Sequence, residues 1–220
     1  MKGDIRMPLN LPNIVYFNEK GNSVLDSETS VYQIPFYKPE EYFSNIDNYT
    51  NFVKGVEKMV RNDDRYTKYI SHLKKEVKLN HCSVLKNITD DDFGGKNGIE
   101  MHHGPIFTLY DYCCIILEYF LYKKWKISTF RVADQVLDEH ERNRIQVVML
   151  STSMHQLVTD RAIFISTDQA YGNLAEFIAK YGCVFSENDK EKMNRYIDRS
   201  MATGSTDYGI LALNDKIYQN

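Results

Sequence analysis

The sequence predicts an α+β fold: a small ββα core with a helical insertion, an N-terminal helical hairpin and C-terminal helices. Three observations predict it. Apolar residues recur with the helical period between residues 47 and 77 and again after residue 108. Two β-rich runs, 98–103 and 145–150, flank that second helical stretch. Pro8, Pro12, Pro35 and Pro39 interrupt any regular period near the beginning of the chain.

Composition limits the class of protein. A chain of 220 residues with 43% hydrophobic and 13% aromatic residues buries a full core and is not intrinsically disordered. We expect one domain with appendages. The formal net charge of -3 excludes a protein-wide basic field, so any contact with DNA has to be local. Candidate cationic clusters are Lys123, Lys124, Lys126 and Arg131, and separately Arg142 with Arg144, although such clusters are more often solvated helix and loop faces.

Cysteine usage and hydropathy predict an intracellular protein without a membrane span. The four cysteines form no C-x-x-C pair, and adjacent Cys113 and Cys114 lie in an apolar run that suits buried side chains better than zinc ligands. The start, Met1 to Asp4, lacks the apolar region of a signal peptide. The longest apolar stretch, broken by Glu118, is far shorter than the roughly 20 residues of a spanning helix. We expect a cytoplasmic location.

The elements before the histidine pair follow from local patterns. Residues 1–46 are expected to form an extended arm, and residues 47–79 a helical hairpin divided at Asn62-Asp63-Asp64. A short strand is expected at 82–85. The stretch from Thr89 to Gly95 contains three consecutive aspartates, but it lacks the alternating ligands of a calcium loop and is interpreted as a solvated turn.

The elements after the pair alternate between helix and strand. Thr108 and Asp111 predict a capping box for a helix reaching Lys123, and a second helix follows Ser128; together they form the helical insertion, 108–141. The run at 145–150 predicts a strand that leads into a short helix capped by Ser151 or Ser153. Another strand is expected within 161–166, which ends a core of 80–166. Residues 167–220 carry two helices, near 173–181 and 187–201.

The dipeptide His102-His103 is the candidate chemical centre. It ends a β-rich run, Gly104-Pro105 stops the strand, and His155 lies in the later strand-to-helix segment. Neighbouring side chains on a strand point to opposite faces, so one imidazole can bind a metal ion while the other faces substrate. A divalent ion and one general base suffice to hydrolyse a phosphodiester. The alternative to a shared site is that the six histidines of the chain are scattered and have no common function.

These residues carry a resemblance. Glu100-Met101-His102-His103 with its nearby proline, followed by the run from Gln146 to His155, resembles the HNH, or ββα-metal, endonuclease motif. The surrounding sequence is similar to HNH-like proteins common in large bacterial-virus genomes. The likeness covers roughly residues 98–159 and extends to the Tyr171-Gly172-Asn173 segment.

The resemblance implies roles for individual residues. His102 would be a metal ligand, His103 the general base and His155 a second ligand. Either Gln146 or Asn143 would orient the base. The family often has a further ligand one helical turn after the last histidine; here that position is Thr159, so the neighbouring Asp160 is the remaining candidate ligand. The ion would be divalent, with Mg, Mn, Ni and Zn left open.

Two functions therefore follow from the sequence. The first is a divalent-metal-dependent HNH-like endonuclease that hydrolyses DNA and is encoded by a phage. The alternative is a catalytically inactive relative that binds nucleic acid or takes part in phage assembly or packaging, with the N-terminal arm docking to other viral proteins and the chain associated with the virion. The oligomeric state is left open.

Overall fold

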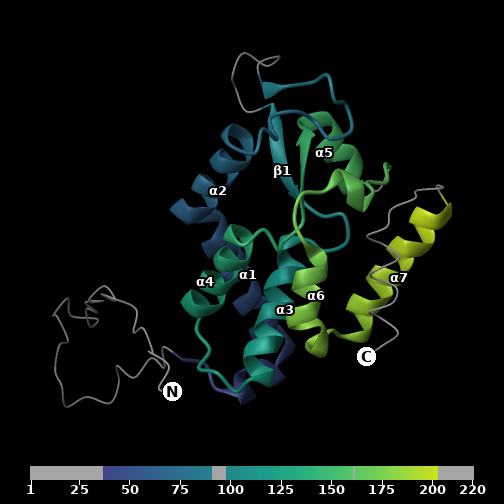
Figure 1. Cartoon of the computed structure of the whole chain (residues 1–220). Helices are drawn as coiled ribbons and strands as arrows, with labels where there is room; N and C mark the ends of the chain where they lie inside the picture. Colours follow the sequence, from purple (N-terminus) through teal and green to yellow (C-terminus); the bar gives the residue numbers. More distant parts are fainter. Residues whose placement is uncertain (1–36, 91–97, 161, 203–220) are drawn as a thin grey trace. The chain divides into compact units, whose positions relative to one another are not determined.

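The computed structural model describes residues 37–90, 98–160 and 162–202, with side chains up to residue 199 (Figure 1). Most of the expected N-terminal arm, part of the acidic turn, and the end of the chain lie outside these residues. The described chain begins with a short bridge between Lys38 and Ile127 and a 3-10 helix, η2 (Glu40–Ser44).

The described elements confirm the α+β class and are mostly helical (Figure 1). Their order is α1 (Ile46–Asn62), α2 (Asp64–Lys75), β1 (Ile99–His103), α3 (Leu109–Tyr122), α4 (Thr129–Glu141), β2 (Val147–Ser151), α5 (Thr152–Thr159), η4 (Thr167–Gln169), α6 (Leu174–Tyr181), η5 (Gly182–Val184) and α7 (Glu187–Ala202).

Side-chain caps fix where several helices begin. Asp63 ends α1 and caps α2, as the break in the sequence predicts. The predicted capping box is confirmed: the Asp111 amide donates to Thr108 Oγ1 at 3.3 Å, and the Thr108 amide donates to the Asp111 carboxylate at 3.0 Å. Ser128 caps α4. Ser151 precedes α5, but its side chain makes no capping hydrogen bond.

The two strands form an antiparallel pair, and α5 follows directly from the second. In this register His102 lies opposite Val148 and His103 opposite Val147. Tyr171 lies beside β2 and extends the sheet by one residue: its backbone N–H donates to the Val147 carbonyl, and its carbonyl accepts from the Val147 N–H, both at 2.8 Å. The ββα unit is therefore assembled from segments about 45 residues apart, with α3 and α4 between its strands.

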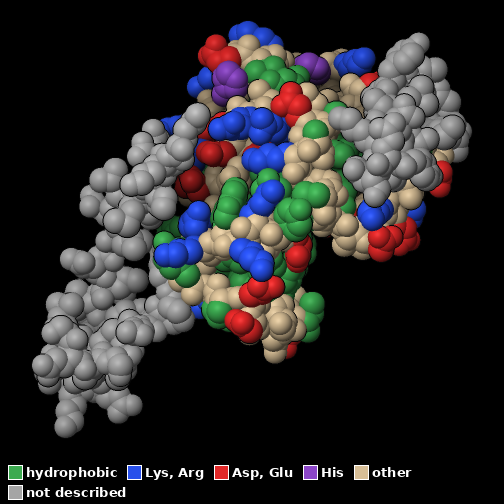
Figure 2. Space-filling view, turned by 60° about the horizontal axis from the view of Figure 1, so that its bottom comes forward, with side chains coloured by type: hydrophobic (Ala, Val, Ile, Leu, Met, Phe, Trp, Pro, Cys, Tyr) green, Lys and Arg blue, Asp and Glu red, His purple; other side chains and the backbone are tan. Residues whose placement is uncertain are grey.

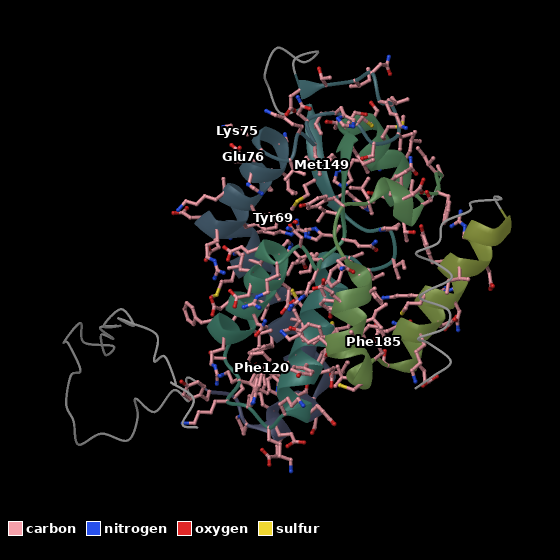
Figure 3. The ribbon with its side chains drawn as sticks, in the orientation of Figure 1. Tyr69, Lys75, Glu76, Phe120, Met149 and Phe185 are labelled. Atoms are coloured by element: carbon pink, nitrogen blue, oxygen red, sulfur yellow. The ribbon has the colours of Figure 1, made fainter. Side chains whose placement is uncertain are left out.

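The buried side chains form two main clusters. The larger is built by α1, α2, α3, α4 and α6, so the two helices between the strands supply much of the principal core. The smaller surrounds the sheet and contains Cys82, Ile99 and Ile165 with the inner residues of β2. Figure 3 labels Phe120 of the larger cluster and Met149 of the smaller one.

Two expected strands were wrong. At 82–85 the chain turns back on itself, because the Cys82 amide donates to the Ile88 carbonyl at 2.8 Å and His81 bridges Thr89. Among the residues that the structure describes, residues 162–166 have no strand partner: the Ala162 amide closes the end of α5 by donating to the Leu157 carbonyl, and the Ile165 carbonyl accepts from the Tyr196 hydroxyl. Apolar β-branched residues alone do not make a strand without a neighbouring ladder.

Within the described ranges, no helix has the length and apolar character needed to cross a membrane. On the face drawn in Figure 2, lysine and arginine side chains lie among acidic and hydrophobic ones.

Candidate functional site

Strand β1 sends its polar side chains to two different environments. Alternation along the strand places Glu100 and His102 on one face and His103 on the other. The sequence predicts this division. The structure shows what each face meets: α5 lies against the Glu100 and His102 face, and buried aromatic side chains surround His103.

The first face brings together the two histidines that are expected to share a metal ion. The rings of His102 and His155 are 4.9 Å apart between centroids and nearly perpendicular. His155 Nδ1 lies 2.5 Å from a carboxylate oxygen of Glu100, whose other oxygen accepts from the Thr152 hydroxyl at 3.3 Å. His155 Nδ1–H therefore donates to the Glu100 carboxylate, because an ionised carboxylate can only accept.

Burial sets the charge state of His102. Removal from water, and next the proximity of His155, lower the pKa of His102 to about 4. His102 is therefore a neutral imidazole at pH 7. The pair places the neutral His102 ring beside a second imidazole that is bonded to a carboxylate, an arrangement able to donate or accept hydrogen bonds or to offer ring nitrogens to an ion.

On the opposite face, His103 is 6% exposed and meets His140 of α4, with the two Nε2 atoms 2.9 Å apart. His140 Nδ1 lies 2.8 Å from the Val136 carbonyl, so Nδ1 carries the proton. Nε2 of His140 is then the acceptor, and His103 Nε2–H donates to it.

Aromatic rings and burial complete this environment. Tyr66 stacks on His103 at 6.1 Å, and Tyr69, labelled in Figure 3, lies edge-on to His140 at 5.3 Å. Burial lowers the pKa of His103 well below its ordinary value and that of His140 to about 4. Although His140 lies in the last turn of its helix, where a cation would be favoured, its side chain is wholly buried and its imidazole is neutral.

Gln146 and Asn143 are held by backbone and core contacts. The backbone N–H of Gln146 donates to the Tyr112 hydroxyl at 3.1 Å. The Gln146 side-chain Oε1 is buried without a hydrogen-bond partner in the described part of the chain. Asn143 has a positive φ of 54°, its Oδ1 accepts from the Tyr69 hydroxyl at 3.4 Å, and its carbonyl accepts from the Asn173 amide. Their expected role as orienting residues stays a prediction.

The candidate ligands at the end of α5 have other partners. The Thr159 hydroxyl donates to the His155 carbonyl at 2.8 Å, and both Asp160 carboxylate oxygens accept from Gln156 at 3.0 Å. Across the residues that the structure describes, no three His, Cys, Asp or Glu side chains are grouped so that they could hold a metal ion. The ligand roles of His102, His155 and Asp160 stay predictions.

An open cleft of about 550 Å³ lies beside the histidines. His102, a small part of the buried His103 and the loop after β1 form one wall, the end of α5 and residues 163–165 another, and α7 the third. Lys192, Arg195 and Arg199 line the wall from α7.

Sequence reasoning assigned no role to Glu100 or to these three cations. Two simple spacings identify them: Glu100 precedes His102 by two residues on a strand, and positions 192, 195 and 199 share one face of a helix.

Comparison with known proteins places the chain in a family. The model of the bacteriophage G278-like virion protein family matches residues 6–219, nearly the whole sequence. No curated protein and no solved structure matches the chain. The match supports the expected phage origin and gives no support to an HNH endonuclease identity. The chain belongs to the bacteriophage G278-like virion protein family.

Proposed function

We propose that this chain is a non-catalytic structural component of the phage virion, in which the ββα unit serves as a scaffold. The observation that carries the proposal is the burial of His103 against His140. A general base must reach the water molecule that it activates, whereas Nε2 of His103 is occupied by a second imidazole inside the core. Membership of a virion protein family supports the same interpretation.

A genetic experiment tests this role. A phage whose copy of this gene is interrupted should produce few infectious particles, and expression of the His102→Ala/His155→Ala chain in the host should restore the yield as well as the wild-type chain does. These histidines are partly exposed, so their loss should leave the fold intact. Rescue by wild type but not by the folded double variant would contradict a non-catalytic role.

A divalent-metal-dependent DNA endonuclease is the second candidate, favoured by the approach of His102 and His155 within the ββα unit. Supercoiled plasmid incubated with the chain and magnesium, manganese, nickel or zinc tests it. Metal-dependent nicking that disappears in His102→Ala and His155→Ala, but persists in the exposed control His72→Ala, would support catalysis. Intact plasmid with every metal would exclude it.

A further inference from the structure

The cleft beside His102 has an uneven charge. Three cations line it, and Asp111 is the carboxylate among its lining residues. Lys192 Nζ pairs with Asp111 at 2.7 Å, which leaves the two arginines as excess positive charge. Arg195 is 3.7 Å from Glu191 and its side chain is 60% exposed, so this contact is weak and open to competition by another anion.

The cations have a regular spacing. Lys192, Arg195 and Arg199 follow one face of α7. Residues 192 and 199 are seven positions apart, which corresponds to a rise of about 10 Å along the helix axis. A helix face of this kind presents charges along a line rather than at a point.

The remaining wall of the cleft is aromatic and held in place. Phe164 lies beside Tyr196, with ring centroids 5.0 Å apart, and the Arg199 guanidinium lies 5.4 Å from the Phe164 centroid. The hydroxyl of Tyr196, in α7, donates a hydrogen bond to the Ile165 carbonyl at 2.9 Å, which holds residues 163–165 against α7. Phe164 is half-buried, so part of its ring lines the opening.

We propose that this cleft binds the phosphodiester backbone of a single-stranded nucleic acid. Arg195 and Arg199 would contact phosphates, and Phe164 would offer a ring face to a base. A cationic groove with an aromatic platform is the chemistry by which proteins hold single strands without reading their sequence. The inference goes beyond a structural role in the particle and does not depend on it.

Fluorescence anisotropy of a labelled oligothymidylate with the full chain tests the proposal. Replacing both arginines, Arg195→Gln/Arg199→Gln, should weaken binding at least tenfold and reduce the slope of log K against log salt by about 1.4, since each phosphate contact on a single strand contributes about 0.7. Arg195→Lys/Arg199→Lys should retain most of that slope. The matched control Lys54→Gln/Lys58→Gln makes the same charge change on exposed positions of α1 and should bind as wild type does.

Competition separates a strand from a simple anion. Unlabelled oligothymidylate should displace the probe at micromolar concentration, and inorganic phosphate should fail to do so at equal phosphate concentration. Unchanged affinity and slope in the Arg→Gln variant, equal loss in the Lys54/Lys58 control, or full displacement by inorganic phosphate would each overturn the proposal. Circular dichroism of each variant establishes that it is folded.

Discussion

Individual buried residues determine how the protein responds to acid. The pair of His103 and His140 is neutral inside the core, where an imidazolium would lose its hydration without gaining a counter-ion. The folded-state pKa of His140 is about 4, below its ordinary 6.5. Between these values the unfolded chain binds more protons, so stability that is complete above pH 6.5 is lost as the pH falls toward 4.

The expected loss for His140 alone is about 3 kcal/mol, since one pKa unit corresponds to about 1.4 kcal/mol. Urea unfolding at a series of pH values from 7.5 to 4.5 measures it. His140→Phe should make this dependence shallower, because it removes one of the two buried imidazoles, and the exposed His72→Gln serves as the matched control. Superimposable pH profiles for wild type and His140→Phe would show that His140 does not contribute to the acid sensitivity.

At Gly172 the fold requires a backbone conformation that other residues rarely adopt. Its φ is +121°, and a Cβ there would lie 2.3 Å from the Ile145 carbonyl oxygen. Gly172→Ala should therefore lower the free energy of unfolding by about 2 kcal/mol or more. Gly55→Ala, within α1, meets only Thr129 at 3.8 Å and should raise it by about 0.5 to 1 kcal/mol. Equal effects of the two changes in thermal or urea unfolding would refute this interpretation.

At the scale of the elements, one buried carboxylate joins α4 to α6. Glu139 is wholly buried and accepts from Lys180 at 2.6 Å, Tyr181 at 2.9 Å, Gln135 at 2.7 Å and Arg144 at 3.1 Å. Burial acts to raise its pKa, but the bond from Lys180 and the other donors outweigh burial, and the pKa is lowered.

Breaking this network should cost more than breaking an exposed pair. Glu139→Gln leaves two partly exposed cations and the buried Tyr181 hydroxyl without a charged acceptor, and the expected loss is about 3 kcal/mol in urea unfolding. Glu187→Gln removes the partner of Lys190 at the surface, where solvent screens the pair, and should have no measurable effect. Comparable losses of unfolding free energy in the two variants would mean that the Glu139 network does not stabilise the packing of α4 against α6.

Helices were more predictable from the sequence than strands. The caps at Asp63, Thr108 and Ser128 act on backbone groups a few residues away, so local sequence contains the whole signal. The strands expected at 82–85 and 161–166 required a partner from elsewhere in the chain, and local sequence does not specify one.

The candidate site was predictable in part for the same reason. Alternation along β1 separates His102 from His103, but the meeting of His103 with His140 joins positions 37 residues apart. No local pattern around either histidine indicates that contact. The approach of His155 to Glu100 likewise depends on how β2 and α5 fold back onto β1.

At the scale of the whole molecule, the proposed role is that of a structural part of the phage particle. Quantitative mass spectrometry of particles purified through a density gradient and washed at high salt tests this role. A structural component should give peptides in a constant ratio to those of the main capsid protein across the particle fractions. Finding the chain only in the soluble lysate, with none in the washed particles, would show that it is not a structural component.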